Sequence, residues 1–184
     1  MGTYAIDLQT TGIGLLLVRL VIGFVMAAHG AQKLFGWFGG YGLRKTGEAF
    51  GQLGFQPGIT FAAAASITEV VSGLLVAFGF LGPIGPALMV SVMIVAALTV
   101  HWEHGLFAAT NGIEVPLLYA AGAFGLALTG FGQYSLDAWL GIAGRWPASF
   151  TWLALIAGIV GGFANLALRR HPAVTVSHAT PNGS

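Results

Sequence analysis

The chain has 184 residues, of which 56% are hydrophobic and only 7% are charged, and its formal net charge is +1. A soluble domain carries about 25% charged residues, so this composition indicates a membrane protein. The small net charge argues against a nucleic-acid partner. Because the chain has no cysteine, it can perform no thiol chemistry itself. Any redox role would therefore need a quinone, a metal or a partner subunit.

Long uncharged runs separate the few charged residues and set the number of membrane spans. A span needs about 20 apolar residues. Helices satisfy their own backbone hydrogen bonds in lipid, whereas barrel strands would show an alternating polarity that is absent here. The sequence therefore predicts an all-α, polytopic membrane helical bundle. Its five expected spans are residues 13–35, 58–80, 82–101, 115–130 and 150–168.

Shorter segments connect these spans. Residues 1–12 are polar and lack the basic region and cleavage site of a signal peptide, so we expect them in the mature protein. Residues 44–55 mix charged and aromatic side chains and predict a short amphipathic helix on the membrane surface. After the fourth span, Ser135 is expected to cap a short helix that has Asp137 in its first turn. Residues 172–184 are small and polar, and we expect a mobile tail.

The distribution of cations predicts the orientation of the chain. With five spans, one side of the membrane carries most of the cations and the other side carries Arg145. The positive-inside rule then places the N-terminus outside and the C-terminus in the cytoplasm, in the inner (plasma) membrane. The cations on the cytoplasmic side are Lys33, Arg44, Lys45, Arg169 and Arg170.

The end of the first span carries an unusual cluster of side chains. His29 and Lys33 lie one helical turn apart, and Trp37 follows among glycines and other aromatic residues. One interpretation is interfacial anchoring, because cations and aromatic rings are common at the membrane surface. The other is a functional site. Earlier in the same span, small residues recur at a spacing that lets a neighbouring helix approach closely, namely Gly23, Ala27 and Gly30.

Two charged residues lie inside apolar spans. Arg19 is about two turns into the first span, where it must either reach the interface or meet an acid. Glu69 lies near the middle of the second span, with Ser66 and Ser72 around the same face. A lone carboxylate at this depth should face the bundle interior and find a cation or take up a proton. Intramembrane acids usually have a function, so Glu69 is the first candidate site residue.

A polar loop follows the third span. It places His101 and His104 on one helical face, with Glu103 and Glu114 nearby. Two imidazoles and a carboxylate can bind zinc or iron, but a further ligand would have to come from elsewhere in the chain. Interfacial polar residues without a metal are the alternative interpretation, and no metal ligand is assigned.

Three segments of the chain resemble the DoxX family of prokaryotic membrane proteins. The motifs are HG-x-x-KLFGWFGG-x-G from His29, E-x-PLL from Glu114 and TG-x-G-x-YSLD from Thr129, with Arg19 and Glu69 in the spans that precede them. The resemblance covers residues 15–140 and implies a DoxX-like four-helix core within residues 13–140. Residues 141–171, a linker and a fifth span, exceed the usual family length and suggest a surface for a partner subunit.

The resemblance also implies a function. A related branch, DoxD, is a subunit of a thiosulfate:quinone oxidoreductase, and other DoxX-like proteins are linked to membrane oxidoreductase complexes that handle oxidative and thiol stress. We therefore expect a membrane subunit of a redox complex that holds a quinone near an Arg19–Glu69 pair. The chain has no haem or iron–sulfur pattern, so it is at most a quinone-linked oxidoreductase subunit that carries no electrons alone.

We expect two sets of site residues under this hypothesis. A buried carboxylate beside a cation can relay the protons that quinone reduction needs, and a histidine can connect it to water. The candidate catalytic residues are Glu69, Arg19 and His29, and the candidate cofactor-binding residues are Lys33, Trp37 and Glu114.

Two other functions remain open. The chain could be a non-catalytic membrane anchor or assembly subunit for oxidoreductase partners, in which Arg19 and Glu69 form a structural ion pair. A small-molecule transporter is less favoured, because the spans lack the paired broken helices and the internal repeat of transporters.

Overall fold

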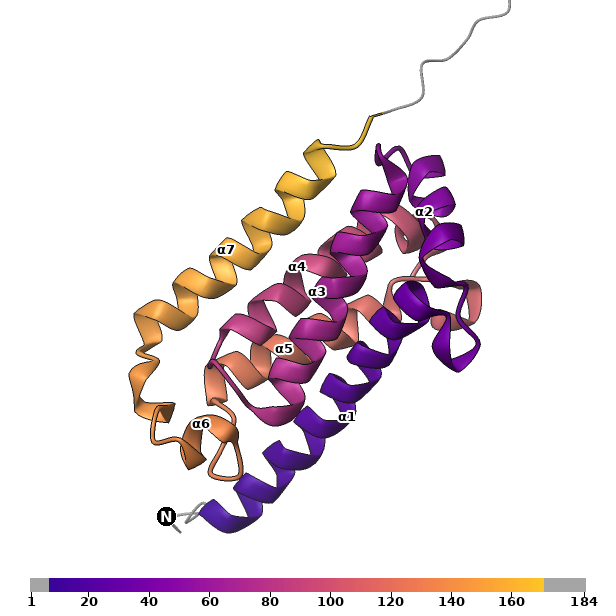
Figure 1. The fold of residues 1–184 in the computed structure, drawn as a ribbon. Helices are drawn as coiled ribbons and strands as arrows, with labels where there is room; N and C mark the ends of the chain where they lie inside the picture. Colours follow the sequence, from indigo (N-terminus) through magenta and orange to yellow (C-terminus); the bar gives the residue numbers. More distant parts are fainter. Residues whose placement is uncertain (1–6, 171–184) are drawn as a thin grey trace, which may run out of the picture.

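The structure is a computed structural model that describes residues 7–170. Within this range the chain is helical and has no strand, so the predicted all-α polytopic bundle is confirmed. The long helices run antiparallel, each to the next, as Figure 1 shows. They are α1 (Leu8–Phe35), α3 (Gly58–Phe78), α4 (Ile84–Ala96), α5 (Glu114–Thr129) and α7 (Ala148–Ala167). The expected tail at residues 172–184 lies outside the described residues.

Four of these helices are long and apolar enough to cross a membrane. They are α1, α3, α7, and α4 with its continuation to His104, which includes a π-helical turn at Ala97–His101. The expected fourth span forms α5 at the predicted place, but α5 has only 16 residues. At 1.5 Å per residue it is about 24 Å long, which is shorter than the roughly 30 Å hydrocarbon core of a bilayer.

The start of α1 is set by a capping side chain. One carboxylate oxygen of Asp7 accepts the N–H of Gln9 at 3.0 Å, and the other accepts the N–H of Thr10 at 3.3 Å. This cap explains why the helix begins before the expected residue 13. Hydrogen bonds from the Thr10 hydroxyl and from these N–H groups hold the pKa of Asp7 below its ordinary value.

Glycines bring α1 and α3 into the most extensive helix contact of the bundle. A Cβ atom added to Gly23 would lie 2.5 Å from the carbonyl oxygen of Gly73, and one added to Gly30 would lie 2.5 Å from that of Ser66. No side chain fits at either position. A Cβ at Gly73 would likewise lie 2.5 Å from the nitrogen of Ala27. The predicted small-residue face of the first span is therefore confirmed, and it fixes the register of α1 against α3.

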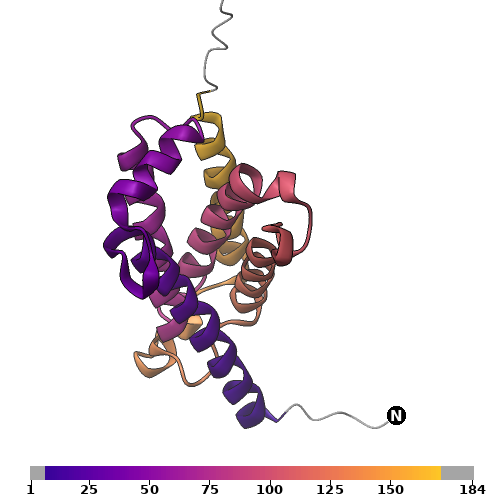
Figure 2. The same cartoon turned by 90° about the vertical axis from the view of Figure 1, so that its right-hand side faces the viewer.

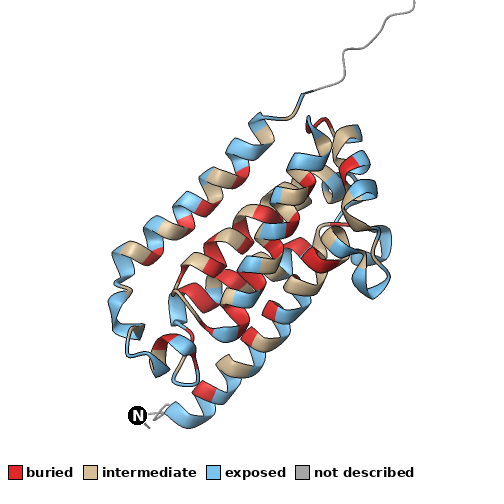
Figure 3. Cartoon of the chain, in the orientation of Figure 1, coloured by how far each residue is buried: buried red, intermediate tan, exposed pale blue. Residues whose placement is uncertain are grey.

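The hydrophobic core lies between α1, α3, α4 and α5, which corresponds to the expected four-helix arrangement (Figures 2 and 3). Its largest buried side chains include Met26, Met89 and Leu155. The last of these belongs to α7, which packs on the outer side of α4. There the carbonyl oxygen of Ala87 leaves no room for a Cβ atom on Gly158. The outward faces of the helices are apolar and exposed, as expected for contact with lipid.

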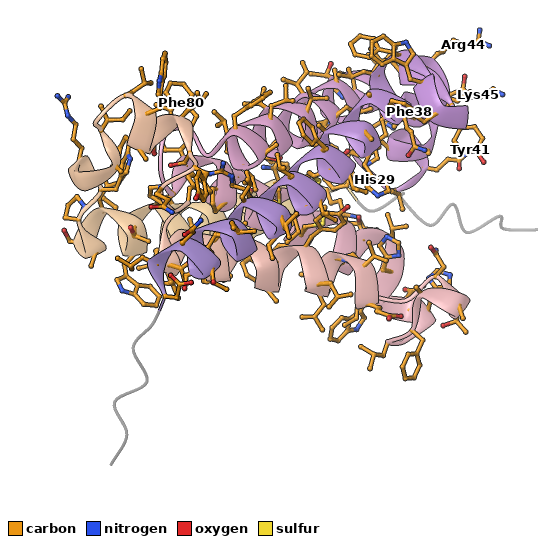
Figure 4. All side chains as sticks on the ribbon, turned by 90° about the horizontal axis from the view of Figure 1, so that it is seen from below. His29, Phe38, Tyr41, Arg44, Lys45 and Phe80 are labelled. Atoms are coloured by element: carbon orange, nitrogen blue, oxygen red, sulfur yellow. The ribbon has the colours of Figure 1, made fainter. Side chains whose placement is uncertain are left out.

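Short helices cover the two ends of the bundle. The predicted amphipathic helix is α2 (Gly42–Gln52), and the end of α7 lies beside it, where the N–H of Arg170 donates to the carbonyl oxygen of Gly54 at 2.8 Å. At the opposite end α6 (Leu136–Trp139) begins at Ser135, whose hydroxyl oxygen accepts the N–H of Ala138 as predicted. Figure 4 shows Arg44 and Lys45 at one end of the molecule and Phe80 at the other.

We expect Gly23→Ala to destabilise the protein by about 1 to 3 kcal/mol, because the new methyl group must push α1 away from α3. Thermal unfolding in mild detergent measures the change. Gly14→Ala is the matched control, since Gly14 lies on the same helix with no atom within 4 Å of its added Cβ. Equal melting temperatures for the two variants would show that the helices are not in close contact at Gly23.

Candidate functional site

Lys33 and Glu69 form an ion pair between α1 and α3. The Lys33 ammonium donates a hydrogen bond to Oε1 of Glu69. The Glu69 side chain is only 2% exposed, whereas that of Lys33 is 34% exposed. The pair is therefore buried on the carboxylate side and open on the ammonium side. The prediction that Glu69 faces the bundle interior and meets a cation is correct, but the cation is Lys33.

The expected Arg19–Glu69 pair does not form. A Cβ atom on Gly79 would lie 2.5 Å from Nη1 of Arg19, so the guanidinium lies level with the end of α3. Glu69 is about ten residues earlier on α3, which is about 15 Å along the helix axis. The antiparallel register of α1 against α3 thus places Arg19 near one end of the bundle and leaves Glu69 within reach of Lys33.

Arg19 instead binds backbone carbonyl groups. Its Nη1 donates to the carbonyl oxygen of Phe131 at 2.9 Å, and its Nη2 donates to that of Tyr134. The residue is 2% exposed, and its Nε has no hydrogen-bond partner among the described residues. These bonds tie α1 to the loop between α5 and α6. Of the two roles expected for Arg19, pairing with an acid is not what the structure shows, because the guanidinium reaches the loop at one end of the bundle.

One oxygen of Glu69 has no partner. Oε2 is buried and accepts no hydrogen bond within residues 7–170. The two nearby serines do not supply one, because the hydroxyl of Ser66 donates to the carbonyl oxygen of Ala62 at 2.6 Å and that of Ser72 to the backbone carbonyl oxygen of Glu69 at 3.3 Å. A buried acceptor without a partner costs about 1 to 3 kcal/mol. Oε2 is thus a place where a proton or a donor group would be stabilised.

An aromatic contact lies one helical turn from the ion pair. His29, one turn before Lys33 on α1, packs edge-on against Tyr119 of α5, with ring centroids 6.1 Å apart and an interplanar angle of 80°. Helix α1 thus carries both the ammonium that binds Glu69 of α3 and an imidazole in contact with a phenol of α5. Sequence analysis missed Tyr119, since only its hydroxyl distinguishes it within an apolar run.

Trp37 and Glu114 make their contacts elsewhere. Trp37 is 59% exposed and packs on Phe35, with ring centroids 5.0 Å apart. Glu114 accepts a hydrogen bond from the N–H of Ala108 at 2.7 Å and so closes the loop before α5. Neither contact involves Lys33 or Glu69. The expected cofactor-binding roles of Trp37 and Glu114 therefore gain no geometric support.

The histidine-rich loop does not assemble a metal site within the described part of the chain. His101 uses Nδ1 in a 2.7 Å hydrogen bond with the carbonyl oxygen of Asn111. Residues 7–170 contain no group of three or more His, Asp or Glu side chains that could hold a metal ion. The third ligand that His101 and His104 would need is thus missing from these residues.

Asp137 has a structural role that sequence analysis did not foresee. Its carboxylate accepts the N–H of Leu81 at 2.9 Å, the N–H of Gly82 at 2.7 Å and the indole N–H of Trp146 at 2.8 Å. Leu81 and Gly82 both have positive φ angles, 61° and 51°, which belong to the tight turn between α3 and α4. The buried acid thus joins this turn to α6 and to the segment before α7. Its only sequence signal was an acid in an apolar context.

Asp137→Asn should destabilise the protein by roughly 1.5 to 3 kcal/mol, because an amide cannot accept all three N–H donors and hydrogen bonds to charged groups are the strong ones. The melting temperature in mild detergent measures the loss. Asp7→Asn is the matched control, since asparagine caps a helix about as well as aspartate. A melting temperature for Asp137→Asn equal to that of the control would contradict the role assigned to this carboxylate.

Neither of the two main cavities borders the ion pair. The larger has a volume of about 500 Å³ and lies between α5, α6 and α7, and the smaller, about 80 Å³, lies between α2, α3, α4 and α7. Lys33 and Glu69 line neither of them. Neither of these two cavities therefore offers space for a quinone ring beside Glu69. The ion pair offers a carboxylate, a cation and a free hydrogen-bond acceptor, which suit the transfer of a proton.

Comparison with known proteins bears on the first half of the chain. A DoxX family model matches residues 14–102, which are about half of the sequence and include α1 to α4. No curated protein and no solved structure matches the chain. Both residues of the ion pair lie inside the matched segment, whereas α5, α6 and α7 lie outside it. The family match and the membrane-length apolar helices show that this chain is an integral membrane protein of the DoxX family.

Proposed function

We propose that this chain is the membrane subunit of a redox complex, in which Glu69 takes up and releases a proton. The observation that carries the proposal is the buried carboxylate with one oxygen bound by Lys33 and the other, Oε2, without a partner among the described residues. Buried acids with a specific charged neighbour are frequent at functional sites. In a membrane span they often belong to proton pathways.

The geometry suggests how a proton reaches Glu69. The Lys33 side chain is about one-third exposed, so the ammonium connects the carboxylate to the end of the bundle that carries α2. When Oε2 takes up a proton, the charge of the carboxylate is lost and its bond to the ammonium weakens. His29, one turn from Lys33 on the same helix, carries an imidazole, a group that can accept and donate protons.

The family resemblance supports a quinone as the co-substrate of the complex, and the structure limits where it can bind. Quinone reduction needs both protons and electrons, and this chain supplies no electron carrier of its own in its sequence. Partner subunits would deliver the electrons. The proton would come from Glu69, while the quinone ring would lie outside the Lys33–Glu69 cluster, because neither main cavity borders it.

The test uses the complex purified from its own membranes in mild detergent through a tag on this chain. The rate at which it reduces decylubiquinone is measured with thiosulfate and with a low-molecular-weight thiol as electron donors. We expect Glu69→Gln to retain its partner subunits and to lower the rate by about a hundredfold or more, since general acid–base groups typically contribute that much.

Glu48→Gln is the control for this experiment, because Glu48 is an exposed acid on α2. Its rate should equal that of the wild type. If Glu69→Gln reduced the quinone at the wild-type rate, the carboxylate would have no part in proton transfer.

A non-catalytic anchor is the second candidate, and α7 favours it. This helix lies outside the family match and is the least buried of the four membrane-length helices. Its outward face carries large apolar side chains, including Trp152, Leu153, Ile156, Val160 and Phe163. A partner subunit with a membrane helix could pack there. If partner subunits copurify with this chain but the complex reduces no quinone, the role of a non-catalytic anchor is favoured.

We also propose the orientation in which α2 and the end of α7 face the cytoplasm. That end carries Arg44, Lys45, Arg169 and Arg170, whereas Arg145 lies at the other. The chain has no cysteine, so single cysteines can be introduced cleanly. A membrane-impermeant maleimide added to intact cells should label Gly144→Cys and leave Glu103→Cys unlabelled until the cells are opened. The reverse pattern would invert the proposed topology.

A further inference from the structure

The larger cavity is a formed pocket at the end of the bundle away from Lys33. It has a volume of about 500 Å³, within the roughly 300 to 1,000 Å³ range of small-molecule sites. The turn between α3 and α4, the end of α5, α6 and the start of α7 all contribute to its wall. Trp146 forms a fixed part of this wall, because its indole donates to Asp137 and its ring would collide with a Cβ atom on Gly82.

One buried polar side chain in this wall makes no hydrogen bond with the described residues. Thr151 is only 7% exposed and lines the cavity, yet its hydroxyl makes no hydrogen bond within residues 7–170. A threonine in a helix usually bonds its own preceding turn, as Thr68, Thr99 and Thr129 do here. Because Thr151 lines the cavity, a hydroxyl group without a protein partner is free there to bond a group of a ligand.

The charges in the wall select the class of ligand. Asp137 is the only charged residue that lines the cavity, and three N–H donors already bind its carboxylate. No Lys, Arg or His side chain lines the cavity to attract an anion. The remaining lining is mostly apolar and includes Pro83, Leu126 and Trp152. The wall is therefore complementary to an uncharged molecule with an apolar body and a hydrogen-bonding head.

We propose that this cavity binds an uncharged amphiphile that presents a carbonyl oxygen to the Thr151 hydroxyl. Two membrane molecules share this chemistry: a quinone, through its ring carbonyl groups, and a neutral glycerolipid, through its ester carbonyl groups. The site is separate from the Lys33–Glu69 pair and does not depend on the function proposed for it. Binding here should therefore be unaffected by Glu69→Gln.

The test is a titration by native mass spectrometry of the full chain in mild detergent. The probes are decylubiquinone, dioctanoylglycerol and dioctanoyl phosphatidylglycerol, the last being an anion with the same acyl chains as the second. We expect one molecule of a neutral probe to bind each chain. The neutral probe that binds more tightly shows whether the ligand is a quinone or a glycerolipid. The anionic lipid should bind at least about tenfold more weakly than the better neutral probe.

Three variants separate the pocket from other lipid contacts. Thr151→Val keeps the shape of the side chain and should weaken binding by about three- to tenfold, the usual worth of one hydrogen bond. Ala143→Trp should abolish binding by filling the cavity from an exposed position on its wall. Thr68→Val, on α3 and outside the wall of this cavity, should bind as the wild type does.

Melting temperatures of all three variants establish that they are folded. No retention of either neutral probe by the wild type would overturn the proposal. Binding of a neutral probe that is the same in Thr151→Val and Ala143→Trp as in the wild type would also overturn it. Binding of the anionic lipid as tightly as dioctanoylglycerol would overturn it as well.

Discussion

The structure depends on a carboxylate buried where two helices come into backbone contact. Gly23, Gly30 and Gly73 allow α1 and α3 to approach so closely that no side chain fits between them. The same register places Glu69 opposite the end of α1, where Lys33 can reach it. A charged carboxylate in an apolar interior is strongly disfavoured without a cation. The pair and the close helix contact therefore require each other.

Four charged residues that lie in or between the helices of the bundle divide into two pairs by the use of their hydrogen bonds. Arg19 and Asp137 are deeply buried and bind backbone groups in the connections between helices, which hold one end of the bundle together. Lys33 and Glu69 instead bind each other and leave Oε2 of the acid available. Arg19 also leaves one atom, Nε, without a partner, but a guanidinium keeps its proton in proteins, whereas a carboxylate can take one up at a free oxygen. This difference is the physical ground for placing chemistry at Glu69 and not at Arg19.

Much of the fold could be predicted from the sequence because it follows from composition and periodicity. The low charge content and the apolar runs gave the helical bundle, and the small residues at Gly23, Ala27 and Gly30 predicted a close helix contact. The ends of a helix were harder to predict where a single side chain sets them, as the Asp7 carboxylate does for the start of α1.

The candidate site was only partly predictable. Glu69 could be identified as a buried acid because its depth in an apolar span allows few alternatives. Its partner could not, since Arg19 and Lys33 lie on the same helix and only the register of α1 against α3 decides between them. That register depends on which glycine meets which carbonyl group. Tyr119 and the large cavity depend on the arrangement of three or more helices, and no local pattern in the sequence encodes it.

The most direct test of the central claim is a double-mutant cycle on the stability of the protein in mild detergent, with Lys33→Met, Glu69→Gln and the double variant. Each single variant leaves a buried or half-buried charge without its counter-charge, whereas the double variant leaves neither charge. If the ion pair joins α1 to α3, the double variant will be more stable than the sum of the single effects predicts, by about 1 kcal/mol or more. Strictly additive effects would contradict the pairing of Lys33 with Glu69.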